Sequence, residues 1–187
     1  MLGSVPPFDA APVPSRPVDP FALRAVLRAI RERRALDVTY QSMSRPEPMR
    51  RIIEPHAIAY DGFRWHARSF DRESGEFRDF VIGRMSKARL GDAAESLATS
   101  DSDWRSFVAL VIAPHPKLTP AQSRAIAMDY GIRGKSTSVK VRRALLFYAL
   151  KRLGLDLLHD ARPPSEQHIV LLNRDEVEAA RGRSTET

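Results

Sequence analysis

The apolar residues of this sequence change their spacing at residue 36, and this change limits the folds that the chain can adopt. Between residues 20 and 34 they recur every three or four positions, which is the period of an amphipathic helix. Asp19 and Pro20 mark the start of that helix, as an N-cap acceptor and a proline at the first helical position. From Leu36 the apolar residues alternate with polar ones, which is the period of a strand. We therefore expect one helix followed by a sheet.

Short strands separated by tight turns are expected up to about residue 90. Asp61-Gly62 is a strong signal for a two-residue hairpin, and Glu73-Ser74-Gly75 indicates a second turn. Several short strands in so few residues are typical of a small antiparallel barrel. The predicted strands cover 36–41, 49–60 with an interruption near Pro55, 63–70 and 77–85.

A second unit is expected after an acidic stretch that is rich in serine and alanine. Its predicted strands alternate with helices, and this order indicates a small open sheet with helices on one face. The strands cover 107–112, 137–141 and 168–172, and the helices 119–130 and 143–153. The predicted fold class is α+β, with a small antiparallel β-barrel and its preceding helix followed by a small α/β module.

Proline and polar residues predict the segments that lie outside these two units. The first 20 residues contain six prolines among small residues, which is typical of a disordered linker. The predicted division is a linker over 1–20, helix and barrel over 21–90, a linker over 91–103, the second module over 104–175 and a flexible tail over 176–187.

Composition excludes several kinds of chemistry. The chain has no cysteine, which rules out disulfides and cysteine-based zinc or redox sites and favours a cytoplasmic protein. No apolar run approaches the ~20 residues that span a bilayer. The formal charge of +7 favours phosphate-bearing partners, although an arginine- and alanine-rich chain from a GC-rich genome would show the same surplus. Charge alone therefore leaves the partner open.

The predicted third strand carries the strongest functional signal. Alternation places Arg64, His66 and Arg68 on one face, and Phe63 and Trp65 on the other, which we expect to pack in the core. Three potential cations on one face repel each other, so such a face is unfavourable unless acids or a bound anion balance it. Guanidinium groups form bidentate hydrogen bonds with phosphate oxygens. The pattern predicts an anion site. The alternative is a solvated face balanced by acids of neighbouring strands: Glu54, Asp71 or Asp79.

Further polar side chains are expected near this face. Tyr40 and Ser42 share a strand face and would add hydroxyl donors, or else serve as a core aromatic and a turn residue. The additional cations on neighbouring strands are Arg50, Arg51, Arg78 and Arg84, of which one or two could pair with acids instead.

Sequence signatures of catalysis are absent. The five histidines show no metal-ligand spacing, and the chain has neither a glycine-rich phosphate loop nor a nucleophile elbow. His56 could act as a base, but no nucleophile or orienting partner is identifiable. We expect no enzymatic activity, no metal and no cofactor.

The first unit contains an ordered set of motifs. They are Tyr40-x-Ser42, Arg51-x-x-x-Pro55-His56, Gly62-x-Arg64-Trp65-His66-x-Arg68, and Phe77-Arg78-Asp79-Phe80 with Arg84. This set resembles the WYL domain, and is most similar to the WYL transcriptional repressors that accompany bacterial phage-defence systems. The Trp-Tyr-Leu triplet that names the family stands here as Trp65-His66-Ala67, and the Trp-His variant favours the defence-associated branch. Residues 107–172 resemble the C-terminal extension of that family.

This resemblance implies an Sm- or SH3-like barrel that senses a ligand, followed by a ferredoxin-like module used in dimerisation. The implied ligand is a nucleic acid, typically single-stranded DNA, or a nucleotide, and the implied partner is a second copy of the chain, with no membrane. The family's pocket positions map onto Tyr40, Ser42, Arg51, His56, Arg64, His66, Arg68, Arg78 and Arg84.

Regulators of this family also carry an N-terminal winged helix-turn-helix that contacts the DNA operator, and residues 1–20 correspond to the linker after it. We expect the chain to be either a fragment of such a regulator or a stand-alone sensor. The predicted function is ligand sensing and dimerisation. The alternative is a non-catalytic dimerisation or scaffold module that contacts the nucleic-acid backbone through a basic surface.

Overall fold

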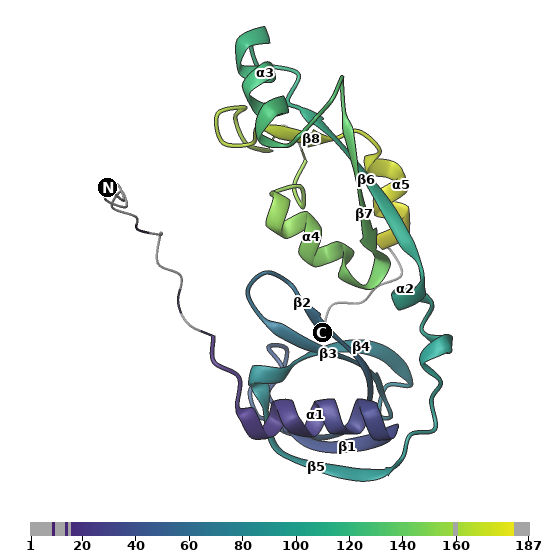
Figure 1. Ribbon diagram of the computed structural model, residues 1–187. Helices are drawn as coiled ribbons and strands as arrows, with labels where there is room; N and C mark the ends of the chain where they lie inside the picture. The colour runs from purple at the N-terminus through teal and green to yellow at the C-terminus, as the bar shows by residue number, and fades with distance from the viewer. Residues whose placement is uncertain (1–8, 10–13, 15, 159–160, 182–187) are drawn as a thin grey trace, which may run out of the picture.

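The computed structural model describes residues 9, 14, 16–158 and 161–181, which form two units packed against each other (Figure 1). The first unit contains α1 (Pro20–Glu32), β1 (Arg34–Tyr40), β2 (Met49–Tyr60), β3 (Trp65–Asp71), β4 (Glu76–Val81), η1 (Ile82–Arg84) and β5 (Met85–Ala93). A connection with η2 (Ala98–Ser100) and α2 (Ser102–Arg105) leads to the second unit. Most of the predicted linker 1–20 lies outside the described residues.

Helix α1 forms where the sequence predicts it. The Asp19 carboxylate accepts hydrogen bonds from the backbone N–H groups of Phe21 and Ala22, so it caps the first turn. The helix ends at Arg33, which adopts the left-handed conformation at φ 50°. Val26 and Ala29 are fully buried, and α1 packs along β1 and β5 (Figure 1). The helix therefore covers the side of the sheet away from the second unit.

The first unit is a five-stranded antiparallel sheet in the order β4-β3-β2-β1-β5. The single strand predicted over 77–85 is wrong, because the 3₁₀ turn η1 divides it into β4 and β5. These strands lie at opposite edges of the sheet, so the chain must turn between them, and the sheet curls around its core. Tyr40 and Phe80 meet inside with their ring centroids 5.0 Å apart. The predicted interruption near Pro55 is a register shift within a continuous β2.

The β2–β3 hairpin has a four-residue loop over 61–64 in place of the predicted two-residue turn. The Asp61 carboxylate accepts hydrogen bonds from the backbone N–H groups of Phe63 and Arg64, both at 2.6 Å. Gly62 adopts φ +98°, a conformation that other residues rarely reach. The Asp-Gly pair thus lies in a turn as predicted. The turn is longer than predicted, because the Asp61 carboxylate accepts from backbone N–H groups two and three residues ahead.

The second unit has the predicted β-α-β-α-β order and a three-stranded antiparallel sheet, β7-β6-β8. Its elements are β6 (Phe107–Pro114), α3 (Pro120–Asp129), β7 (Thr137–Arg142), η3 (Arg143–Leu145), α4 (Leu146–Leu153), β8 (Ile169–Leu171) and α5 (Arg174–Arg181). The flexible tail predicted from residue 176 is wrong up to residue 181, because α5 buries Val177 in this core; residues 182–187 lie outside the described residues.

None of the helices in the described ranges is both long and apolar enough to cross a membrane. The mixed helices and sheets agree with the predicted α+β class.

Candidate functional site

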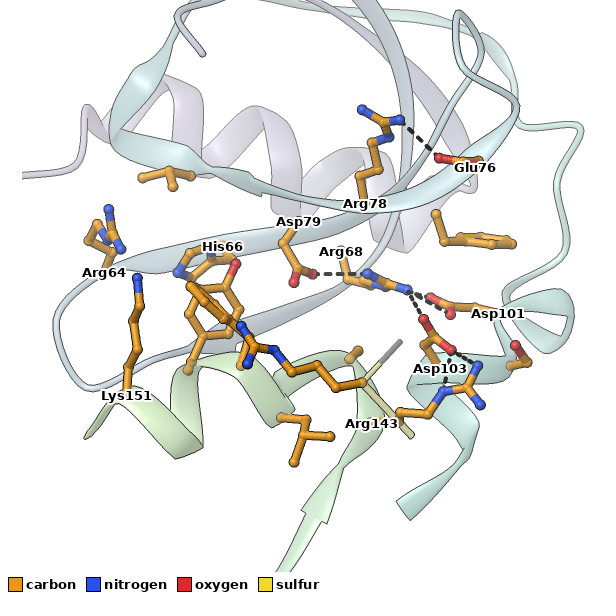
Figure 2. A pocket seen from close by; sticks show the side chains of 18 of the residues that line it. Arg64, His66, Arg68, Glu76, Arg78, Asp79, Asp101, Asp103, Arg143 and Lys151 are labelled. Carbon is orange, nitrogen blue, oxygen red and sulfur yellow. Dashed lines mark hydrogen bonds and ion pairs between the residues drawn. The ribbon is translucent and has the colours of Figure 1, made fainter. Parts of the chain in front are cut away.

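A cleft of about 1260 Å³ lies between the first and second units. One side, which we call the barrel side, is formed by β3, β4 and η1. The other, the C-terminal side, is formed by η3, α4 and α5. The connection over 100–103 closes one end (Figure 2). The barrel side contributes Arg64, His66, Arg68, Arg78 and Arg84 among others, and the C-terminal side Arg143, Phe147, Tyr148, Lys151 and Arg181.

The third strand alternates as predicted, but the exposure of its two faces is not what we expected. His66 and Arg68 are almost completely buried because the second unit packs over them. Trp65 and Phe63, predicted to lie in the core, are 46% and 49% exposed. Both lie at the hairpin end of the barrel, where its core ends. The basic face is therefore covered and the aromatic residues are exposed.

Arg68 is held by three carboxylates (Figure 2). Its Nε and Nη2 donate to the two carboxylate oxygens of Asp101 at 2.7 and 3.0 Å, in bidentate geometry. Its Nη1 donates to Asp79 at 3.4 Å, and its Nη2 lies 3.9 Å from Asp103. Burial disfavours its charge, but the bond to Asp101 and these negative charges outweigh burial and raise the pKa of Arg68. Its positive charge is thus already balanced within the fold.

Asp101 anchors the connection to the barrel. Its carboxylate also contacts His56 Nε2 at 3.0 Å and accepts the backbone N–H of Trp104, which caps α2. Burial opposes ionisation of this carboxyl, but the bonds from His56 and Arg68 outweigh burial and hold the pKa of Asp101 well below its usual range. The segment predicted as an acidic linker over 91–103 therefore contributes a buried anion.

Asp103 carries the same network into the second unit. It forms an ion pair with Arg143, whose Nε donates to Asp103 Oδ1 at 2.6 Å, while its other oxygen faces Arg68. The side chains of Asp103 and Arg143 are 14% and 19% exposed, so solvent reaches this pair more easily than it reaches Arg68 and Asp101. The carboxylates of one short segment thus connect the two sides of the cleft.

A second contact between the units involves His66, Tyr148 and Asp79. The rings of His66 and Tyr148 lie 4.7 Å apart, and His66 Nε2 lies 2.9 Å from the Asp61 carboxylate. Burial raises the pKa of Asp79, against the opposing effect of Arg68. Burial and the nearby Asp79 likewise raise the pKa of Tyr148. This part of the cleft is tightly packed and belongs to the structural contact between the units.

The cations that face the open part of the cleft are more exposed than Arg68 and have fewer carboxylate partners. Arg64 is 33% exposed and lies 3.4 Å from Asp61, and Arg78 pairs with Glu76 at 2.9 Å. Among the described residues, no carboxylate lies within ion-pair distance of Arg84 or Lys151. These side chains can bind an anion without breaking a buried ion pair.

The structure brings six of the nine predicted site residues to the cleft: Tyr40, Arg64, His66, Arg68, Arg78 and Arg84. The other three do not line it. Ser42 contacts Ser44, Arg51 pairs with Asp71 and Glu73, and His56 lies behind the cleft on Asp101. Tyr40 is buried, and its hydroxyl accepts the backbone N–H of Val81, so its ring belongs to the barrel core.

Sequence reasoning missed the contributions of the connection and of the second unit. Asp101 and Asp103 have a local signal, since an aspartate before a short helix is a typical N-cap and a second one in the first turn favours the same helix end. Arg143, Tyr148 and Lys151 have none, because only the packing of the two units places them opposite β3.

Comparisons with known proteins match both units. Residues 22–90 match the family described as WYL domain, and residues 107–177 the family described as BrxR transcriptional regulator, C-terminal dimerization domain. The DNA-binding transcriptional repressor CapW of Stenotrophomonas maltophilia is 39% identical over 177 residues, which are 94% of this chain and 59% of that protein.

Two further relatives have the same name. CapW of Escherichia coli (strain KTE188) is 36% identical over 178 residues, covering 95% of this chain and 60% of that protein. CapW of Pseudomonas aeruginosa is 37% identical over 176 residues, covering 94% and 59%. The chain thus spans about three fifths of the length of the curated relatives that it matches.

Proposed function

This chain belongs to the WYL-domain proteins, as its motifs predict, and we propose that it is the effector-binding and dimerisation part of a transcriptional repressor of the phage-defence type. The cleft between the two units is the proposed effector site. The proposed effector is a phosphate-bearing ligand, either a single-stranded DNA or a nucleotide. We expect the chain to act by binding and not by catalysis.

The observation that carries this proposal is the placement of solvent-accessible cations on both sides of one cleft: Arg64 and Arg84 are partly exposed and Lys151 is exposed. Arg64 and Arg84 face it from the barrel, and Lys151 faces it from α4. Guanidinium and ammonium groups at a partly desolvated surface bind phosphate oxygens through charge-assisted hydrogen bonds. Because the cations come from two units, one bound ligand would contact both units at once.

A ligand in this cleft can also affect how the units are held together. The Asp103–Arg143 ion pair crosses the cleft beside the ligand space. A phosphate that binds Arg143 competes with Asp103 and changes the balance between two arrangements of the second unit, which contains the dimerization domain. Such a ligand alters repression only if it binds the two arrangements with different affinity.

The test is a double variant that removes the barrel-side cations. Arg64→Ala with Arg84→Ala should lower affinity for a single-stranded oligonucleotide at least about tenfold, with little change in melting temperature, because neither side chain is fully buried. The matched control is Arg50→Ala with Arg89→Ala, which removes two exposed arginines of the same barrel outside the cleft. Affinity is measured by fluorescence anisotropy.

Equal losses in the two double variants would contradict the cleft assignment. That result, together with a steep dependence of affinity on salt concentration, would instead support a scaffold that binds the nucleic-acid backbone through a diffuse basic surface.

A further inference from the structure

Three exposed aromatic residues lie together at the tip of the β2–β3 hairpin, outside the cleft. Tyr60, Phe63 and Trp65 are 52%, 49% and 46% exposed. Side chains of this size are usually covered, and a contiguous exposed group of them marks an interaction site. Neither the barrel core nor the contact between the two units accounts for this group.

The aromatic surface is held in a fixed arrangement. Tyr60 and Trp65 are register partners on β2 and β3, and their ring centroids lie 4.9 Å apart with the planes inclined by 40°. The Tyr60 hydroxyl donates to the Gly62 carbonyl at 3.0 Å, which fixes the orientation of its ring. The two rings therefore form a rigid surface that loses little conformational entropy when a flat partner binds.

Cations surround this surface. The Arg16 guanidinium lies 5.2 Å from the centroid of the Phe63 ring. The guanidinium of Arg152 on α4 lies directly against Gly62, in the space that a Cβ would occupy at that position. Arg64 lies in sequence between Phe63 and Trp65. The only carboxylate in the loop, that of Asp61, is buried and bonded to the loop backbone and His66.

The hairpin tip lies between this surface and the cleft. Arg64 and Lys151 lie at the same end of the cleft (Figure 2). Trp65 follows Arg64 on the opposite face of the strand, and Arg152, which follows Lys151 on α4, lies against Gly62 at the hairpin tip. A ligand that leaves the cleft at this end therefore has to pass Arg152 and the hairpin tip to reach the aromatic rings.

We propose that this hairpin surface, made of Tyr60, Phe63 and Trp65, is a stacking site for bases of a single-stranded nucleic acid whose backbone is held in the cleft. Exposed aromatic rings that alternate with cations are the combination that binds single strands, because the rings stack on bases and the cations bind phosphates. This inference rests on the proposed function and extends it. The effector is then an oligonucleotide that is longer than the cleft, and not a mononucleotide.

The test compares a long and a short ligand. For the Trp65→Ala variant, affinity for an oligothymidylate of about 12 nucleotides should fall about tenfold, while affinity for the dinucleotide pTpT should stay unchanged. Trp65→Phe keeps a stacking ring and should retain most of the affinity. The matched control is Phe107→Ala, which removes an exposed ring of the second unit that also contacts cations, Lys140 and Arg142.

A spectroscopic measurement separates stacking from a structural effect. The chain has two tryptophans, so in a Trp104→Phe background all tryptophan emission comes from Trp65. Stacking of a base on Trp65 should quench this emission with the long oligonucleotide and not with the dinucleotide. Unquenched emission, or equal affinity of wild type and Trp65→Ala for the long ligand, would overturn the stacking site.

Three other outcomes identify what fails. If pTpT binds wild type and length brings no further affinity, the stacking site is wrong while the cleft assignment stands. If the wild type binds neither ligand, the proposed function fails first. If Trp65→Ala changes the molecular mass in solution instead of oligonucleotide affinity, a protein segment covers the hairpin surface and the inference is overturned.

Discussion

The two sides of the cleft carry positive charge in different ways. On the barrel side, Arg68 lies on a strand, is nearly fully buried and contacts three carboxylates. On the C-terminal side, Lys151 lies on a short helix, is exposed and has its ammonium group over the ring of Phe147. Arg68 is therefore part of the folding core, whereas Lys151 can exchange partners. Net charge does not reveal this difference, since both residues count as one cation.

The largest expected effect is at the buried ion pair of the barrel side. Asp101→Ala should lower the free energy of unfolding by about 3 kcal/mol, because it leaves Arg68 buried without its bidentate partner and removes the cap of α2. Chemical denaturation measures this loss. The control is Asp92→Ala, whose carboxylate pairs with Arg72 but is 67% exposed, and which should cost less than about 1 kcal/mol.

If Asp101→Ala and Asp92→Ala lowered the free energy of unfolding by similar amounts, the buried ion pair would contribute no more to stability than an exposed one. The contrast between Arg68 and Lys151 would then fail. A large loss confined to Asp101→Ala would support it.

A smaller effect is expected from acid. Because the pKa of Asp101 is lowered by folding, its contribution to stability is complete above the unfolded pKa, about 3.9, and is lost as pH falls through the folded value. Between about pH 7 and pH 3, wild type should lose about 1 kcal/mol more than Asp101→Asn. Burial raises the pKa of Asp79, so ionisation of this group lowers the stability as the pH rises. This contribution has the opposite sign, but it is present in wild type and in Asp101→Asn alike. Denaturation curves at the two pH values give this difference, and parallel losses would contradict it.

The parts of the fold that were predicted correctly depend on local signals. Asp19-Pro20 starts α1, and the Asp61-Gly62 pair places a hairpin, because capping and turn formation involve only neighbouring residues. The division of the strand over 77–85 could not be predicted, since the need to turn at η1 arises from the opposite edges of the finished sheet. Helix α5 was missed because it is polar apart from the side that holds Val177.

The candidate site was also predicted only in part, because only some of its features depend on neighbouring residues in the sequence. Alternation correctly placed Arg64, His66 and Arg68 on one face, because this depends on the strand alone. Which face is buried depends on a unit that is distant in sequence, so the aromatic residues were assigned to the core and Arg68 to an open anion site. Because Arg68 pairs with Asp101, it is a structural residue and not the ligand contact that the sequence predicts. A pattern in a single sequence cannot pair two residues that are 33 positions apart.

The smallest expected effect tests the C-terminal side. Lys151→Ala should change the free energy of unfolding by less than about 0.5 kcal/mol, because the side chain is exposed. If a single-stranded ligand contacts both sides of the cleft, the variant should bind it about threefold more weakly. The slope of log affinity against log salt concentration should also fall by about 0.7, since one phosphate contact is lost.

The control for Lys151→Ala is Lys140→Ala, which removes an exposed lysine of the same unit that contacts Phe107 and does not line the cleft. Anisotropy titrations at several salt concentrations should separate the two variants in both affinity and slope. Identical slopes would mean that the ligand contacts the barrel side alone. The C-terminal side would then influence binding only through the Asp103–Arg143 ion pair, and an exposed cation beside a cleft would be no evidence of contact with the ligand.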